Sequence, residues 1–211
     1  THFHADHISG LDGVLRGRRV DELEVTGLAE PADNAGAVAA IAAATGLRPR
    51  VPALGETRRL GDVVLQVVSL GAGVAAQDPG VHTDEPPGEG SAANNASIVT
   101  VAEVGGIRIL LTGDIEPEAQ ARLAATVSGL QVDVLKVPHH GSSHQDLDWL
   151  LSLGARVALI SVGADNDYGH PSPDVVDALT AAGTLVLRTD LQGDLAVTVT
   201  ADGSVASATE R

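Results

Sequence analysis

The chain contains no cysteine and no methionine, and only one tryptophan, one tyrosine and one phenylalanine among its 211 residues. Without cysteine it can form neither a disulfide framework nor a thiolate metal site. The apolar 44% is nearly all Ala, Val, Leu and Ile, so the core must be aliphatic. No apolar run approaches the ~20 residues of a membrane span, and no signal peptide is visible. We therefore expect a soluble chain that forms one domain over residues 1–211.

Positive charge is scarce as well. The formal net charge is −15, and Lys136 is the single lysine. A broad electrostatic surface for nucleic acid is normally basic, so this composition argues against one. It does not exclude a nucleic-acid enzyme, because bound divalent cations can reverse the local charge of a site.

Hydrophobic patterning predicts strands that alternate with helices. Strands are expected at 22–27, 62–68, 133–138, 156–163, 184–190 and 194–200, with a hairpin within 96–114 around Gly105 and Gly106. Helices are expected at 12–19, 33–46, 116–127, 145–154 and 172–183. Residues 71–95 lack periodicity and are expected to form a long mobile loop. This order favours a layered α/β architecture over an all-β sandwich.

Ligand-type side chains gather in four patches, each of which opens the chain or follows an apolar strand. The patches are HFHADH (2–7), TGD (112–114), PHHGSSH (138–144) and DNDYGHP (165–171). Strand ends are where α/β folds place their sites. All the histidines except His82 fall in these patches. Histidines scattered over the surface would rarely cluster in this way.

The first patch has the spacing of metal ligands. Alternate residues of an extended segment point the same way, so His2 and His4 can hold one metal ion. Asp6 and His7 come after a turn and can face a second ion. Because a zinc site needs three or four ligands, the other patches must complete the set.

Asp114 is the natural bridge between two ions, because a carboxylate has two oxygens, although a helix N-cap would also explain it. His139 and His140 follow a strand, and either can supply the missing imidazole. Two cations ~3.5–4 Å apart can acidify a bridging water and then stabilise the departing oxygen. No separate nucleophile is needed, so Ser142 and Ser143 are interpreted as loop residues or phosphate hydrogen-bond donors.

The fourth patch allows two interpretations. One is a simple turn before a helix, with His170 facing solvent. The other places His170 and Asn166 at the mouth of the site, as phosphate contacts or, for His170, as a proton donor. Two further residues are open in the same way: His144 fits a loop or helix-cap role, and Asp190 either faces the metals from outside or ends a strand in a turn.

The stretch THFHADH resembles the HxHxDH signature of the metallo-β-lactamase fold, an αββα sandwich of hydrolases. The stretches NNASIV, LLTGDIE, LKVPHHGSSH, ISVGADNDYGHPSPDVVDAL and LRTDLQGD add a narrower resemblance, to the C-terminal hydrolase domain of the ComEC competence-protein family. That domain is attached to a membrane channel that imports single-stranded DNA, and degradation of the other strand is attributed to it. The resemblance implies an α/β metallo-β-lactamase-like αββα sandwich, N-terminally truncated because the strands before the motif are missing.

The resemblance also implies two divalent ions, zinc or manganese, and a set of site residues. The implied ligands are His2, His4 and Asp114 for the first ion, and Asp6, His7, Asp114 and His140 for the second. The implied catalytic residues are Asp6, Asp114, His139 and His170. The implied substrate contacts are Asn95, Ser142, Asn166 and His170. The family's further histidine is replaced by the turn NNAS, so the first ion should be weakly held. Because the strands before the motif are missing, His2 and His4 should be the least well anchored ligands.

The leading hypothesis is a phosphodiesterase that degrades the non-imported DNA strand during natural transformation. Its partners would be DNA and the membrane channel of the same full-length protein, on the extracytoplasmic side of a bacterial membrane. One alternative is a hydrolase of a small ester, lactone or phosphocholine substrate, against which the scarcity of aromatics weighs. Another is a catalytically inert module that binds DNA or a partner.

Overall fold

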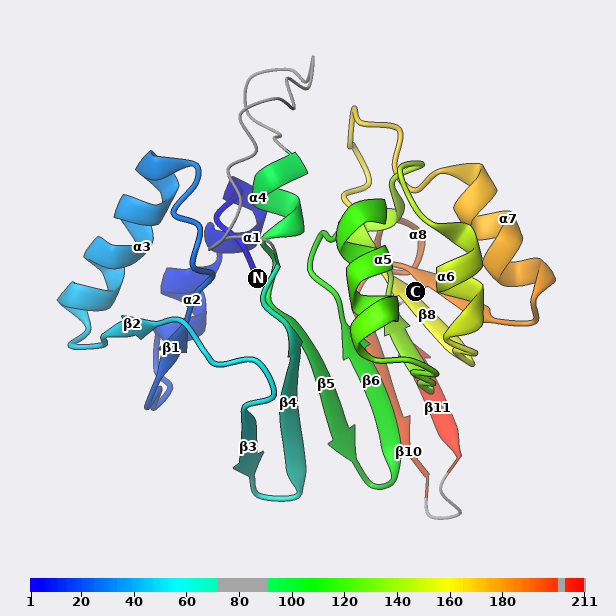
Figure 1. Ribbon diagram of the computed structural model, residues 1–211, viewed down its shortest axis with the longest axis horizontal. Coiled ribbons are helices and arrows are strands. Elements are labelled where there is room, and N and C mark those ends of the chain that lie inside the picture. Colours follow the sequence, from blue (N-terminus) through cyan, green and yellow to red (C-terminus); the bar gives the residue numbers. More distant parts are fainter. Residues whose placement is uncertain (72–90, 201–203, 211) are drawn as a thin grey trace.

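A mixed seven-stranded sheet organises the computed structural model, which describes residues 1–71, 91–200 and 204–210 (Figure 1). Its strand order is β3-β4-β5-β6-β7-β8-β9. The bounds are β3 Thr57–Leu60, β4 Val63–Ser69, β5 Val99–Val104, β6 Ile107–Leu111, β7 Val134–Lys136, β8 Val157–Ile160 and β9 Leu185–Arg188. Neighbours from β3 to β6 run antiparallel, and neighbours from β6 to β9 run parallel.

Helices connect the parallel strands and the flanking segments. They are α1 Ala5–Ile8, α2 Leu11–Leu15, α3 Ala32–Ala44, α4 Ser91–Asn95, α5 Pro117–Thr126, α6 Leu147–Ser152, α7 Pro173–Ala181 and α8 Thr189–Gln192, with a short 3-10 turn at Pro138–Gly141. Because α5, α6 and α7 follow β6, β7 and β8 in turn, the parallel half of the sheet is built from three strand–helix–strand units.

The sheet is covered on both faces. On one face, α5, α6 and α7 pack against the main aliphatic cluster, which includes Leu110, Leu135 and Ile160, all fully buried (Figure 1). On the other face, the hairpin of β10 (Leu195–Val199) and β11 (Val205–Thr209) covers a smaller cluster around Val134 and Val157. The parallel strands are therefore buried on both sides, as their continuous apolar sequences require.

A small second sheet lies beside the antiparallel half, where β1 (Leu23–Glu24) pairs in parallel with β2 (Pro49–Arg50) next to α3 (Figure 1). Arg50 and Arg58 form ion pairs with Glu22, Glu24 and Glu56, which tie this pair of strands to β3. The described residues thus contain one large sheet and two small two-stranded ones, so the second layer of the expected sandwich is slight.

The predicted α/β class is confirmed, and most elements fall where the sequence places them. The hairpin forms at Gly105 and Gly106, whose φ values of 58° and 80° suit a tight two-residue turn. Three expectations differ. The strand expected at 22–27 has only two residues, and ion pairs of Arg50 with Glu22 and Glu24 add to its short pairing. No strand was expected at 49–50, 57–60 or 205–209. In the expected mobile loop, residues 91–95 are helical, and residues 72–90 lie outside the described part.

No helix in the described part of the chain is long and apolar enough to cross a membrane. The single domain over residues 1–211 stays a prediction.

The aliphatic core gives the first testable prediction. The variant Leu135→Ala, which truncates a fully buried side chain in β7, should lower the free energy of unfolding by about 2–5 kcal/mol, because it leaves a cavity that the sheet and helices cannot refill. Leu185→Ala in β9 is the matched control, since that side chain is about half exposed. Urea unfolding measures both variants, and an equal loss in the two would contradict the described packing.

Candidate metal centre

Three of the predicted patches meet at one edge of the sheet. Asp114 follows β6, His139 and His140 follow β7, and His170 lies in the loop after β8. Since these strands run parallel, their carboxyl ends share the same edge. The first patch is attached to the same sheet through Thr1, whose carbonyl accepts a hydrogen bond from the N–H of Ile98, the residue before β5. The sequence prediction that the patches assemble at strand ends therefore matches the fold.

The turns at this edge have constrained backbones. His139 and His140 have φ values of 45° and 52°, a left-handed conformation that non-glycine residues adopt only at a cost. Gly113, with φ of 58°, could not carry a side chain, because a Cβ there would lie 2.6 Å from Ser97 Oγ. His139 N–H donates to the Gly113 carbonyl at 3.3 Å, so the two turns support each other.

Asp6, His7, Asp114 and His140 form the compact group of the site. One ligand atom from each lies within 4.8 Å of all the others. Asp114 Oδ2 lies 3.0 Å from His7 Nε2 and 3.3 Å from His140 Nε2, and His140 Nε2 lies 2.9 Å from Asp6 Oδ2. These are the four residues expected to hold the second ion. Of the two competing histidines, His140 is the one that joins the group.

Electrostatics in this group favour a cation. Burial alone would raise the pKa of Asp114, but contacts with His140 and His7 outweigh it and hold that pKa far below its usual range. Burial opposes a charged His140, yet Asp114 and Asp6 raise its pKa to about 10. Contact with His140 lowers the pKa of Asp6 to about 2. Without a metal, the imidazolium of His140 therefore offsets one of the two carboxylate charges, and a divalent ion would take the place of its proton.

The buried polar atoms fit a metal ion. Among the described residues, Asp114 Oδ1 and His2 Nε2 are buried without a hydrogen-bond partner. Burial of such atoms is costly unless something binds them. Carboxylate oxygens together with imidazole nitrogens suit zinc, manganese or iron. The donor set and its unpartnered atoms thus fit a divalent cation.

His2 is firmly anchored, contrary to the expectation of weak anchoring. It is 4% exposed, and its Nδ1 lies 3.1 Å from Ser97 Oγ, which also accepts the Asp114 N–H. Burial and the nearby His7 lower the pKa of His2 to about 3, so its ring is neutral, as a ligand must be. Ser97 in the NNAS turn therefore links both expected ligand sets and orients His2 from behind.

The expected first set is less compact than the second. His2 and His4 have ring centroids 4.5 Å apart, in line with their alternate spacing. In the part of the chain that the structure describes, however, His2, His4 and Asp114 do not form a ligand group as close as the other. Asp6 and His7, which were expected after a turn, lie on the short helix α1, and both belong to the group around Asp114. A first ion on His2 and His4 stays a prediction.

Sequence reasoning gave no role to Glu116, which lies next to the metal group. Its carboxylate is 3% exposed and accepts a hydrogen bond from Asn94 Nδ2 at 2.8 Å. His139 Nδ1 lies 3.4 Å from Glu116 Oε1, and His144 Nδ1 lies 3.6 Å from Oε2. Burial would raise the pKa of Glu116, but contacts with His139, Ser91 and Asn94 lower it to about 2. The sequence signal that could have identified Glu116 is its position two residues after Asp114.

Three of the expected substrate contacts are engaged within the protein. Asn95 is buried, and its Oδ1 accepts the Glu116 N–H at 2.9 Å. Ser142 Oγ accepts the His144 N–H at 3.2 Å. Asn166 donates to the carbonyls of Gly163 and His170 and accepts the His170 N–H. These side chains shape the loops, and direct contact of each with substrate stays a prediction without geometric support.

His170 does reach the site. Its ring centroid lies 5.5 Å from that of His139 and 6.1 Å from that of Tyr168. His144 is largely exposed in the loop before α6, as its loop interpretation predicts. Asp190 forms a two-point ion pair with Arg188, at 2.5 and 3.1 Å. This pairing favours the turn interpretation of Asp190 over one in which it faces the metals.

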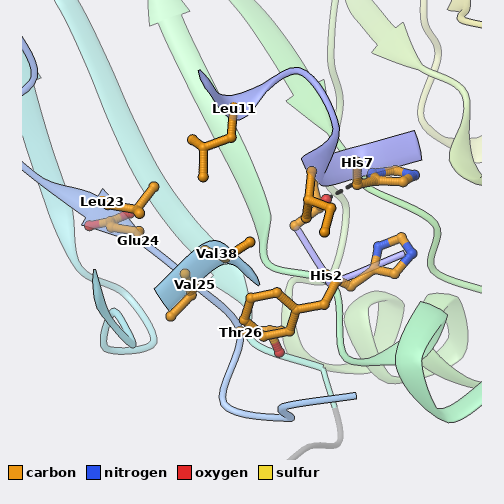
Figure 2. A pocket seen from close by; sticks show the side chains of 11 residues that line it. His2, His7, Leu11, Leu23, Glu24, Val25, Thr26 and Val38 are labelled. Carbon is orange, nitrogen blue, oxygen red and sulfur yellow. Dashed lines mark hydrogen bonds between the residues drawn. The ribbon is translucent and has the colours of Figure 1, made fainter. Parts of the chain in front are cut away.

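A pocket of about 150 Å³ lies beside His2 and His7 (Figure 2). Figure 2 shows His2 and His7 on one side, and Leu11, Leu23, Val25 and Val38 on the other. The dashed line marks the 2.9 Å contact between Thr1 Oγ1 and His7 Nδ1. Ligand sites for small molecules are usually larger, at roughly 300–1,000 Å³.

The fold and site define an α/β protein with a candidate metal centre, and no family model matches the chain. It is 33% identical over 199 residues to ComE operon protein 3 of Bacillus subtilis, covering 92% of this chain and 23% of that protein. It is 35% identical over 104 residues to Competence protein ComA of Neisseria gonorrhoeae, covering 48% of this chain and 15% of that protein. The chain thus spans less than a quarter of the length of either relative.

Among solved structures, it is similar to the metallo-beta-lactamase fold protein YhfI from Bacillus subtilis, with a TM-score of 0.47 and 13% identity over 99% of this chain and 75% of that one. The sequence matches show that the chain is a homologue of the ComEC competence proteins. The resemblance stated from its motifs is confirmed.

Metal binding should stabilise the folded chain. An ion that binds only the folded form adds about 2.7 kcal/mol at a concentration of 100 times its Kd. We expect Mn²⁺ or Zn²⁺ to raise the Tm, EDTA to reverse the shift, and Asp114→Asn to reduce it. Apparent affinity should rise with pH toward about 10, because His140 must release its proton. Thermal unfolding with the exposed Asp62→Asn as control tests this, and equal shifts in both variants would contradict the site.

Glu116 should make the metal-free chain sensitive to acid. Its folded pKa of about 2 lies below the ordinary value of 4.5, so its contribution is present above pH 4.5 and is lost as the pH falls toward 2. The stability gap between the wild type and Glu116→Gln should shrink over that range. Urea unfolding in EDTA measures it, with exposed Glu118→Gln in the first turn of α5, the helix that follows Glu116, as the control. A gap for Glu116→Gln that does not change with pH would refute the assignment.

Proposed function

We propose that this chain is a metal-dependent phosphodiesterase that cleaves DNA. The observation that carries the proposal is the convergence of Asp6, His7, Asp114 and His140 within 4.8 Å at the carboxyl edge of the parallel strands. When bound there, divalent ions would supply an activated water and neutralise the charge on phosphate oxygens.

The protein's own residues would divide the remaining work. Asp114 would hold the ions with the group described above, and Ser97 would fix His2 against them through its Oγ. His139 would contact the phosphate or donate a proton to the departing oxygen. Glu116 lies on the Nδ1 side of His139, so the other ring nitrogen would be the one available for this role. His170, next to His139, would complete this side of the substrate path.

The homologues supply the context of the proposal. One of them is named as a competence protein, and another as a protein of the ComE operon. We infer that the substrate is the DNA strand that is not imported, and that the partner is a membrane channel within the same full-length protein. The site would then work on the extracytoplasmic side of a bacterial membrane.

Two other functions receive less support. A small ester, lactone or phosphocholine substrate would need an enclosed cavity, and the pocket beside His2 and His7 has only about 150 Å³. An inert module that binds DNA or a partner would not need unpartnered, buried ligand atoms such as Asp114 Oδ1.

The test is hydrolysis by the full chain loaded with Mn²⁺ or Zn²⁺. We expect cleavage of bis-p-nitrophenyl phosphate and of linear DNA. Asp114→Ala should lower the rate more than the roughly 10–100-fold that loss of an outer-shell group costs, because it removes a ligand itself. Asp62→Ala, an exposed carboxylate in the turn between β3 and β4, is the control. Turnover of nitrocefin or a lactone without phosphodiesterase activity would overturn the proposal.

A further inference from the structure

Tyr168 is an exposed aromatic residue in a chain that has very few. Phe3 and Trp149 are both 6% exposed and belong to the interior, whereas the Tyr168 side chain is 68% exposed. Burial of aromatic area usually contributes strongly to stability, so an exposed ring at a site edge calls for a reason. Tyr168 lies in the loop between β8 and α7, which also carries His170.

A run of rings connects Tyr168 to the metal group. The Tyr168 ring stacks on His170, with centroids 6.1 Å apart and planes inclined by 21°. The His170 ring lies 5.5 Å from His139, and the His139 ring lies 6.3 Å from His140. Tyr168 is therefore the outer end of an aromatic path that begins at a candidate metal ligand.

The loop holds this arrangement in place. Asn166 Nδ2 donates to the His170 carbonyl at 2.9 Å and to the Gly163 carbonyl at 3.0 Å, while its Oδ1 accepts the His170 N–H. Ser172 N–H donates to the Gly141 carbonyl at 2.7 Å, which ties the loop to the turn after β7. A platform that is fixed before binding loses less entropy when a ligand stacks on it.

The charges of the protein favour stacking over a basic surface. Most arginines are already paired with carboxylates: Arg16, Arg19, Arg50, Arg58, Arg108, Arg156 and Arg188. The amino group of Lys136 donates to the Val137 carbonyl at 2.9 Å. Phosphate contacts away from the ions would have to compete with these ion pairs, so other contacts would have to add affinity there. Aromatic rings provide this for unpaired bases of any sequence.

We infer that Tyr168, supported by His170, is a stacking platform for a nucleobase of the strand whose phosphate lies at the metal group. The inference rests on the proposed function and narrows its substrate class. In a duplex, each base is already stacked and paired, so a protein ring can reach it only after it is extruded. The substrate is then single-stranded DNA, or the unpaired end of a duplex.

The test compares Tyr168→Ala with Tyr168→Phe, which keeps the ring, and with Leu60→Ala, an equally exposed truncation in β3. The substrate is a single-stranded oligothymidylate, beside an abasic strand of the same length, with the metal-loaded full chain. We expect Tyr168→Ala to raise KM for oligothymidylate by roughly 5- to 150-fold, with the effect on KM and not on kcat. Tyr168→Phe and Leu60→Ala should match the wild type, and the abasic strand should not distinguish the variants.

A second measurement does not depend on catalysis. Tyr168 is the only tyrosine, so its fluorescence should be quenched when oligothymidylate binds and should not respond to the abasic strand. An unchanged KM in Tyr168→Ala, with bis-p-nitrophenyl phosphate still hydrolysed by the wild type, would overturn the platform and leave the phosphodiesterase intact. Quenching without any phosphodiester hydrolysis would support the platform and overturn the proposed activity. Absence of both would overturn both.

Discussion

The site depends on the burial of one carboxylate at the end of β6. Asp114 is 2% exposed, and a buried charge is costly unless it is paired and hydrogen-bonded. Its backbone N–H donates to Ser97 Oγ, and its Oδ2 lies next to His7 and His140. Removal of one partner would leave an uncompensated charge in the interior. The HFHADH segment and the turn after β7 must therefore both close on this residue, which explains why distant parts of the chain carry matching ligands.

The two halves of the sheet contribute differently to this closure. The parallel strands β6, β7 and β8 bring three turns to one edge and are buried on both faces, so the turns cannot shift independently. The left-handed backbone at His139 and His140 is a local cost that such a rigid frame can maintain. The segment before β5 supplies Asn94, on α4, and Ser97. Ser97 Oγ accepts the backbone N–H of Asp114, and Asn94 donates to the Glu116 carboxylate, so both acidic residues are held in position before any ion arrives.

The sequence predicted the α/β class, most strands and helices, and the residues of the compact ligand group, with His139 and His140 left as alternatives for its last member. These follow from short-range patterns, since apolar periodicity marks the elements and parallel strand ends must meet. It did not predict what Ser97, Glu116 and Asn166 do. Ser97 is 95 positions from His2, and Glu116 is 23 from His139, so their contacts exist only after folding. Asn166 was assigned to substrate because polar loop residues look available in a sequence, whereas its amide is used up by its own loop.

If this acidic chain cleaves DNA as proposed, its attraction for that polyanion must be local. The formal net charge of −15 repels DNA at a distance, and the paired arginines do little to offset it. The ligand group concentrates carboxylates where divalent ions would bind, so the positive charge that attracts a phosphate would arrive with the metal and be confined to a few ångströms.

A strand held at one such point needs a second, uncharged contact to fix its direction across the site. The ring of Tyr168, joined to the metal group through His170 and His139, lies where that contact would be made. Charge at one end of the aromatic path and stacking at the other would select a flexible, unpaired strand without reading its sequence.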